Sequence, residues 1–299
     1  MSYIYHMRYT KDISKVECKY CKSKNIIKYG KSKGKQCYFC KDCKHKFVDN
    51  GNFVKMRTEK DVIVAALDLY FEGLSVRKVQ RQLANILRVK VSQMTIWKWI
   101  IKYSRLAKEF VDSLKLENIS GDWHVDETTI RCDGEFKWFW QVIDKETKFL
   151  IATHLSGERT IEEALKLFRQ AKERVIERPN KIVVDGLWAY ERAFKKVFYS
   201  RYKEHRVEFV RRAGIRARET NNIVERLHGT LKDRIKVMRG LKSEETAEII
   251  LSGWFVFYNF IRPHESLKGK TPAEAVGLDL GLKHKWHELI ELATKYSYS

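Results

Sequence analysis

The hydrophobic pattern in the second half of the chain most constrains the fold. Beyond residue 118, three segments of alternating apolar and polar residues are separated by short turns, which predicts three consecutive antiparallel strands. Two further apolar runs follow, each after a segment with helical periodicity, and strands connected through helices are usually parallel. We expect strands at 122–130, 136–143, 147–155, 181–185 and 207–210, with helices at 160–177 and 189–199. The sequence therefore predicts an α/β fold in which helices flank a mixed sheet.

Three carboxylates occupy informative places in this pattern. Asp126 lies within the first strand, Asp185 closes the apolar run of the fourth, and Glu225 lies on a later helix. We expect the buried stripe of that helix to comprise Ile223, Leu227, Leu231, Ile235 and Met238. Glu225 then lies on the opposite face, two turns before Lys232. Two strand carboxylates and a helix carboxylate can hold two divalent cations, which favour oxygen ligands and promote in-line displacement at phosphorus.

Four motifs carry a resemblance to a known family. They are His124-Val125-Asp126-Glu127-Thr128, Val184-Asp185-Gly186, Asn221-Asn222-Ile223-Val224-Glu225-Arg226-Leu227-His228-Gly229-Thr230-Leu231-Lys232 and Tyr258-Asn259-Phe260-Ile261-Arg262-Pro263-His264-Glu265-Ser266-Leu267. In this order they resemble the motifs of the DDE transposases of bacterial and archaeal insertion sequences, which are related to retroviral integrases. The resemblance covers roughly residues 118–278 and implies a ribonuclease-H-like fold, in agreement with the predicted order of strands and helices.

The resemblance also implies residue roles. Asp126, Asp185 and Glu225 are expected to be catalytic and to hold two Mg²⁺ or Mn²⁺ ions, and Lys232 is expected to contact the DNA end. Glu127 is a weaker candidate, because successive side chains of a strand point to opposite faces. The implied reaction begins with cleavage at the ends of a mobile insertion sequence, where water releases a 3′-hydroxyl. That hydroxyl then attacks target DNA. Because two ends must be brought together, a homo-oligomer is implied.

Five of the six cysteines lie near the N-terminus. Cys18 and Cys21 form one C-x₂-C pair and Cys40 and Cys43 a second, with eighteen residues between the pairs. This spacing predicts a four-cysteine structural Zn²⁺ site in a small ribbon. The alternative is a reduced, metal-free cysteine cluster. Cys37 does not fit either pair and is expected to be a free thiol.

Three short helices are predicted after the ribbon, starting near Thr58, Ser75 and Ser92. Their lengths and the glycine turn between the first two resemble a helix-turn-helix unit. In that arrangement Gln93 and Thr95 face DNA bases and Lys98 contacts phosphate. The alternative is a helical packing module with no contact to DNA.

The formal net charge of +21 predicts a polyanionic partner. DNA is the first candidate, because neutralising phosphates releases counterions, and RNA or an anionic membrane surface is the alternative. A cationic loop before the Glu225 helix is expected to clamp phosphate: it contains Arg211, Arg212, Arg216 and Arg218. The longest uncharged apolar run, Ile249 to Ile261, is too short to span a bilayer. We therefore expect no membrane contact, and the resemblance to insertion-sequence transposases implies a cytoplasmic, nucleoid-associated location in a prokaryotic cell.

These features predict four segments. A zinc ribbon occupies 1–50, a helix-turn-helix domain 56–106, a ribonuclease-H-like catalytic domain 118–278 and a C-terminal tail 279–299. The function expected from the resemblance is metal-dependent cleavage and strand transfer at the ends of an insertion sequence. Two alternatives remain, namely a non-catalytic DNA-binding regulator derived from a transposase and a ribonuclease-H-like nuclease that cleaves without joining.

Overall fold

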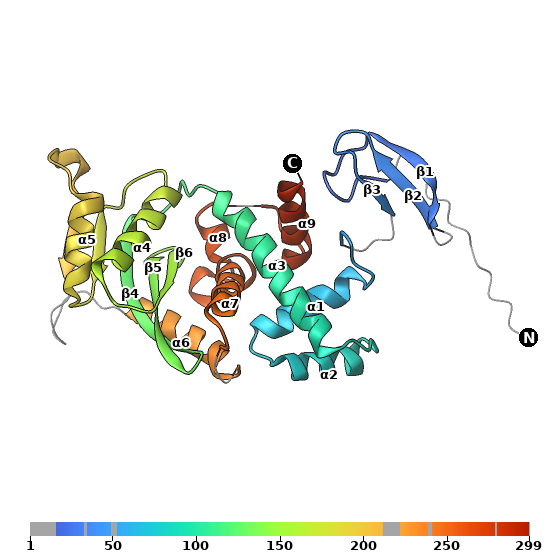
Figure 1. Cartoon of the computed structure of the whole chain (residues 1–299). Coiled ribbons are helices and arrows are strands. Elements are labelled where there is room, and N and C mark those ends of the chain that lie inside the picture. The colour runs from blue at the N-terminus through green and yellow to red at the C-terminus, as the bar shows by residue number, and fades with distance from the viewer. Residues whose placement is uncertain are drawn as a thin grey trace, which may run out of the picture.

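The computed structural model describes residues 16–32, 35–48, 53–211, 222–238, 241–278 and 280–298. A five-stranded sheet lies at one end of the molecule and a three-stranded sheet at the other, with a set of helices between them (Figure 1). Within the described residues, no helix combines the length and the apolar character that crossing a membrane requires.

The larger sheet has the mixed architecture that the sequence predicts. Its strands are β4 (Asp122–Cys132), β5 (Glu135–Asp144), β6 (Leu150–Ser156), β7 (Lys181–Val184) and β8 (Glu208–Arg211). They are arranged in the order β6-β5-β4-β7-β8. The first three are antiparallel, whereas β7 runs parallel to β4 and β8 parallel to β7. This order and these directions are those of a ribonuclease-H-like fold.

Two helices connect the parallel strands. They are α4 (Ile161–Arg174) and α5 (Trp188–Phe198), followed by the short η2 (Lys203–His205). Aromatic side chains join α5 to the sheet, because Trp140 of β5 lies edge-on to Tyr190 at 5.6 Å and Trp123 of β4 lies edge-on to Phe198 at 6.0 Å. Phe168 of α4 packs on the same two α5 rings, and these fully buried rings form the centre of the core beside the larger sheet.

The middle of the molecule is helical. Its elements are α1 (Lys60–Phe71), α2 (Val76–Ile86), α3 (Gln93–Ser113), α6 (Asn222–Lys236), α7 (Glu244–Val256), the π-helical turn η3 (Phe257–Ile261), η4 (Glu265–Leu267), α8 (Pro272–Ala275) and α9 (Lys285–Ser297). Ser75 and Ser92 cap α2 and α3, each accepting a hydrogen bond from a backbone N–H three residues later. The long α3 packs against both α7 and α9, and α7 in turn contacts β6, so α3 links the N-terminal helices to the part of the chain that contains the larger sheet.

The segment expected as a C-terminal tail is instead the helix α9. Trp286, Leu289 and Ile290 are buried where α9 packs on α1 and α3. The expectation of a tail is therefore wrong in this part of the chain, and α9 belongs to the helical middle of the molecule.

The last motif of the sequence docks the helices onto the sheet. Asn259, which is fully buried in η3, forms two hydrogen bonds with the backbone of Leu150, one from the Leu150 N–H and one to its carbonyl, each 2.9 Å long. The buried N–H and carbonyl groups of Leu150, at the start of β6, thus find their hydrogen-bond partners in a side chain of η3.

We expect Gly253→Ala to lower the free energy of unfolding by about 1–3 kcal/mol. Gly253 lies where α7 crosses α3, and an added Cβ would collide with Ser104 and Phe71. Gly229→Ala on α6 is the matched control, because no atom lies within 4 Å of its added Cβ. That control should stabilise by about 0.5–1 kcal/mol, since alanine favours a helix interior. Denaturant unfolding of both variants tests the crossing, and equal stability of Gly253→Ala and the unaltered protein would contradict it.

The smaller sheet comprises β1 (Ile26–Ser32), β2 (Lys35–Cys40) and β3 (Lys46–Val48) in antiparallel order. It contacts the C-terminal helix rather than the larger sheet. Tyr298 lies edge-on to Tyr20 with ring centroids 4.7 Å apart, and Lys22 Nζ lies 2.7 Å from Glu291 Oε2. The N-terminal and C-terminal segments thus meet in the folded chain.

Candidate active site and metal centres

The pairing of β4 with β7 brings two of the predicted acids together. The parallel register ends at Val125 opposite Val184, so the next residues, Asp126 and Asp185, lie side by side at the carboxyl end of β7. The prediction that they lie on neighbouring central strands is confirmed. A carboxylate oxygen of each, together with one of Glu127, falls in a group whose members all lie within 4.8 Å of one another.

The expectation that Glu127 points away from the site is wrong. Its carboxylate reaches the group, although its side chain starts from the other face of β4. Glu127 is 8% exposed, accepts a hydrogen bond from the Tyr190 hydroxyl and forms an ion pair with Arg159. Strand alternation fixes the direction of a Cβ atom, but a long side chain such as that of Glu127 can still turn its carboxylate to its neighbours.

Arg159 was not found from the sequence. It lies between β6 and α4, with its guanidinium 4.7 Å from the Trp138 ring centroid. Besides its ion pair with Glu127, its Nη2 lies 3.4 Å from Asp185 Oδ2. Arg159 therefore supplies positive charge between two carboxylates of the group. No local pattern marks it, because its partners lie more than twenty residues away along the chain.

The environment of Asp126 disfavours an isolated negative charge. Burial raises the pKa of Asp126 to about 7, with further increases from the charges of Glu127 and Asp185. Burial likewise raises the pKa of Glu127. A cation bound among these carboxylates would offset this repulsion, and hard divalent cations such as Mg²⁺ favour such oxygen donors.

A buried amide beside the acids supports the same conclusion. Gln141 of β5 lies directly opposite Asp126 in the antiparallel register and is fully buried. Neither polar atom of its side chain has a hydrogen-bond partner among the described residues. Buried polar groups are nearly always hydrogen-bonded, so this amide has unused capacity for a bound water or ligand. The residues present therefore fit a hydrated divalent cation.

We expect Asp126→Asn to be more stable than the unaltered protein at pH 8 without added divalent cations. Because folding raises the pKa of Asp126 from 3.8 to about 7, the stability that its protonated form contributes is fully present below pH 3.8 and is lost as pH rises through 7. An uncharged amide avoids this loss. Thermal unfolding of the variant and the unaltered protein from pH 4 to 8 tests this prediction. Each kcal/mol by which the variant is more stable should raise its unfolding midpoint by about 2–4 °C. Equal midpoints at pH 8 would contradict the buried placement of this carboxylate.

Glu225 is not in the group of three carboxylates. It lies exposed on α6, which packs against β4, and Lys232 is exposed on the same helix. The fully buried residues of α6 are Val224, Leu227, Leu231 and Arg234, and the other members of the predicted stripe, Ile223, Ile235 and Met238, pack partly buried against the core. Arg234 stacks on the ring of Tyr70 in α1, with the guanidinium 3.8 Å from the centroid. The catalytic role of Glu225 therefore stays a prediction.

A cationic cavity adjoins α6. Its volume is about 550 Å³, and its positive lining residues are Lys145, Lys148, Arg226 and Arg262. His124, two residues before Asp126 on β4, and His264 also line it. Burial lowers the pKa of His264 to about 4, so its imidazole is neutral at physiological pH. Glu265 also lines the cavity and Lys145 pairs with Asp122 over 3.3 Å, so its positive charge comes chiefly from Lys148, Arg226 and Arg262, and this excess suits an anionic ligand.

The remaining predicted DNA contacts lie in two places. Arg211 ends β8 and donates a 2.6 Å hydrogen bond from Nη2 to the carbonyl of Gly186, the residue after Asp185. The other predicted residues of that loop, Arg212, Arg216 and Arg218, lie outside the described residues. Gln93, Thr95 and Lys98 occupy the first turns of α3. Gln93 and Lys98 are exposed there, and Gln93 Nε2 donates to Gln80 Oε1 over 3.1 Å.

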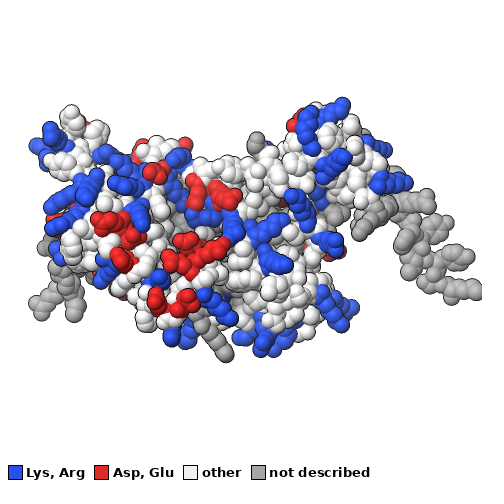
Figure 2. Space-filling model, viewed as in Figure 1, with Lys and Arg blue, Asp and Glu red and all other residues white. Residues whose placement is uncertain are grey.

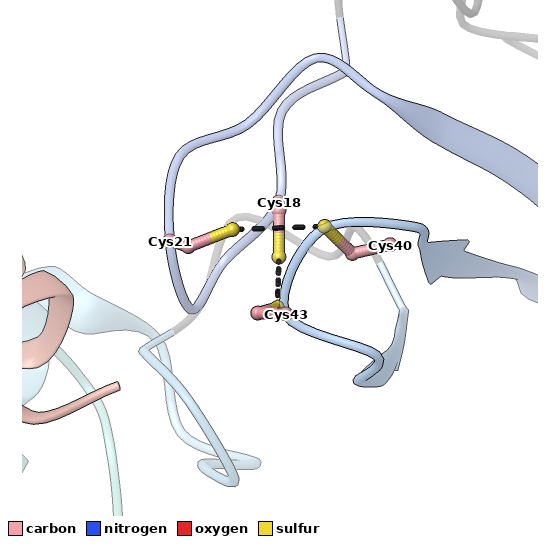
Figure 3. Close-up of side chains that lie close together, drawn as sticks. All are labelled: Cys18, Cys21, Cys40 and Cys43. Atoms are coloured by element: carbon pink, nitrogen blue, oxygen red, sulfur yellow. Dashed lines mark hydrogen bonds between the residues drawn. The ribbon is translucent and has the colours of Figure 1, made fainter. Parts of the chain in front are cut away.

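The four predicted zinc ligands converge (Figure 3). Sγ of Cys18 lies 3.5 Å from Sγ of Cys43, and Sγ of Cys21 lies 3.6 Å from Sγ of Cys40. All four sulfurs lie within 4.8 Å of one another. A tetrahedral site with bonds of about 2.3 Å requires sulfur–sulfur distances of about 3.8 Å, so the cluster fits Zn²⁺. Cys37 is not a member, in agreement with its prediction as a separate thiol.

The backbone prepares this cluster for a metal. Lys22 and Lys44, each directly after a cysteine pair, adopt the left-handed conformation with φ of 60° and 59°, which turns both pairs in the same way. Burial raises the pKa of the Cys40 thiol, but hydrogen bonds from the N–H groups of Cys43 and Asp42 bring it down to about 7. Burial instead raises the pKa of Cys18 and Cys43, so Cys40 is the ligand most readily ionised near neutral pH, and a bound cation would stabilise the other thiolates.

Comparison with known proteins adds the following findings. Residues 120–264 match the family model of a DDE domain of the IS240 transposase type. An uncharacterized protein of Methanocaldococcus jannaschii is 25% identical over 225 residues, covering 73% of this chain and 95% of that protein. The magnesium-bound catalytic core of HTLV-2 integrase in its dimeric form is 15% identical, with a TM-score of 0.39, over 55% of this chain and 99% of that chain.

A second structural match is a chain of the simian T-cell lymphotropic virus intasome in complex with a regulatory subunit of PP2A. It is 16% identical with a TM-score of 0.40, over 54% of this chain. The match spans 55% of the length of that chain, which is little more than half.

Proposed function

Because residues 120–264 belong to the DDE transposase family, we propose that this protein cleaves the ends of a mobile insertion sequence and joins them to target DNA. The observation that carries the proposal is the adjacency of Asp126, within β4, and Asp185, directly after β7, at the point where the parallel pairing of these central strands ends. Paired carboxylates at this position are suited to metal-dependent phosphoryl transfer, since they place hard oxygen ligands where a phosphodiester can approach.

In the proposed site, Asp126 and Asp185 hold the catalytic metal, and Glu225 is the third ligand. When bound there, two Mg²⁺ or Mn²⁺ ions would supply activation of the nucleophile and stabilisation of the leaving oxygen. Tyr190 and Arg159 hold the Glu127 carboxylate in place beside them. The contact of Arg159 with Asp185 also keeps that carboxylate turned towards the group.

The proposed DNA contacts surround this site. Arg211, fixed by its bond to Gly186, lies at the rim beside Asp185 and would contact phosphate near the cleaved bond. Lys232 shares the exposed side of α6 with Glu225 and would contact the DNA end. The cationic cavity beside α6 would hold a neighbouring stretch of the backbone.

The proposed partners are the terminal inverted repeats and a target duplex. We assign end recognition to the Zn²⁺-bound ribbon and to a helix-turn-helix formed by α1–α3, with Gln93 and Thr95 facing bases and Lys98 on phosphate. The active assembly is proposed to be a homo-oligomer, because two ends must react together. A location with the bacterial or archaeal nucleoid follows from DNA as the substrate.

A strand-transfer assay tests the proposed function. Labelled duplexes from the borders of the gene are incubated with the full chain, Mg²⁺ and a supercoiled target. Joined products support the transposase. Nicked products without joining would instead indicate a nuclease, and binding without cleavage would indicate a regulator.

A further inference from the structure

A second cationic hollow lies away from the acid group. It has a volume of about 1170 Å³ and is formed by α2, the turn before α3 and the end of α6. Its charged lining residues are Arg77, Lys78, Arg81, Lys90 and Lys236. Figure 2 shows Lys and Arg side chains gathered along the lower edge of the molecule, where Figure 1 places α2. No aspartate or glutamate lines this basic groove.

The positive charges of the basic groove have no carboxylate partners among the described residues. All five side chains are exposed, and none forms an ion pair with a carboxylate in the part of the chain that the structure describes. Like charges gathered in a hollow repel one another and concentrate a positive potential there. An anionic partner of similar extent would relieve that repulsion.

The walls of the basic groove are held in fixed positions. On one side, Gln80 Nε2 donates over 2.8 Å to the carbonyl of Val91, which ties α2 to the turn before α3. On the other side, Arg234 stacks on Tyr70, and the Tyr70 hydroxyl contacts Met238 Sδ at 3.9 Å. The end of α6 is therefore docked on α1, so the groove spans the helical module and the catalytic domain without needing to be assembled by a ligand.

We propose that the basic groove binds the sugar–phosphate backbone of duplex DNA, so that a single duplex contacts α2 and the end of α6 together. The inference rests on the proposed function and extends it to a separate binding site. Its lining contains no aromatic side chain on which an unpaired base could stack, as single-strand sites require. Lys, Arg, Ser and Gln side chains are instead those that contact backbone phosphates.

The position of the groove along α6 predicts where on the DNA it acts. Lys236 follows Glu225 by eleven residues, and at a rise of 1.5 Å per residue they lie about 16 Å apart along the helix axis. Phosphates of one strand are spaced by about 3.4 Å along a duplex axis. The groove should therefore contact backbone about five nucleotides from the position nearest Glu225, and it should do so regardless of base sequence.

Salt-dependent binding of the full chain tests the inference. Arg77→Gln, Arg81→Gln and Lys236→Gln are made separately in an Asp185→Asn background, which keeps the duplex uncut. Each should reduce the slope of log affinity against log salt by about 0.9, equally for border DNA and an unrelated duplex. Lys203→Gln on η2 removes an exposed cation elsewhere and should leave the slope unchanged. Phosphate ethylation interference should map the loss to about five nucleotides from the cleaved bond.

Unchanged slopes in all three groove variants would overturn the groove assignment and leave the transposase proposal standing if the unaltered chain still joins DNA. Tighter binding to single strands than to duplex would also overturn it. Failure of the unaltered chain to bind any duplex would overturn both the groove and the proposed function. An unchanged thermal unfolding midpoint in each variant will show that the substitution has not altered the fold.

Discussion

Asp185→Asn will abolish strand cleavage and joining while leaving the affinity for duplex DNA within about twofold. The substitution removes one charge from the two neighbouring aspartates that are predicted to hold the metal, Asp126 within β4 and Asp185 directly after β7. Metal stabilisation of a phosphoryl transition state is worth several kcal/mol, so the rate should fall by roughly a thousandfold or more. Cleavage of labelled border DNA gives the rate, and calorimetric titration with Mn²⁺ should show weaker metal binding independently of activity.

Asp133→Asn is the matched control. Asp133 occupies the β4–β5 hairpin turn with φ of 51°, a conformation that asparagine tolerates well, so cleavage should be unchanged. If Asp185→Asn cuts at a rate comparable to the control, the metal assignment is wrong. The same assay identifies the third ligand: loss of cleavage in Glu225→Gln supports the residue on α6. If cleavage is lost in Glu127→Gln but not in Glu225→Gln, the third metal ligand is Glu127, whose carboxylate already lies beside Asp126 and Asp185.

Loss of zinc will unfold the ribbon. Its core consists of Val16, Cys18, Tyr20, Tyr38, Cys40, Phe47 and Val54, so two of its seven buried residues are themselves ligands. A core of this size cannot offset the conformational entropy of ordering the segment, whereas zinc supplies about 10–16 kcal/mol in small modules of this kind. We expect one zinc per chain, and rapid proteolysis within 16–48 after chelation or in Cys40→Ser. Circular dichroism of the isolated ribbon with and without zinc should show the same folding transition.

Cys37→Ser is the control for this loss, because Cys37 lies in the same strand as Cys40 but outside the sulfur cluster. It should bind zinc and resist proteolysis like the unaltered chain. A ribbon that stays protease-resistant in Cys40→Ser would contradict a structural role for the metal. Zinc affinity should also fall as pH is lowered, since protons compete with the metal for the thiolates.

Local signals were sufficient to predict much of the fold. The turn at Asp133 and Gly134, both with positive φ, was marked by residues that tolerate this conformation, and it sets the β4–β5 register. The alternation of apolar residues then predicted the antiparallel strands, and the intervening helices predicted the parallel ones. The proximity of Asp126 and Asp185 followed from placing their strands side by side and in parallel, since the register then sets the residue after Val125 beside the residue after Val184.

Features that depend on distant partners could not be predicted in this way. Arg234 is buried on α6 because Tyr70, far earlier in the chain, presents its ring to the guanidinium. Nothing in the periodicity of α6 marks an arginine as a buried residue. Arg159 and Gln141 likewise gain their significance from neighbours across the sheet rather than from their own surroundings in the sequence.

The contact between α9 and the ribbon has a consequence for how the protein is made and handled. Tyr298 packs against both Tyr20 and His45, and Glu291 pairs with Lys22, so the ribbon meets this docking surface only after the chain between them, including the larger sheet, has been synthesised. Removal of α9 should accordingly free the ribbon from the rest of the molecule without disturbing its sulfur cluster.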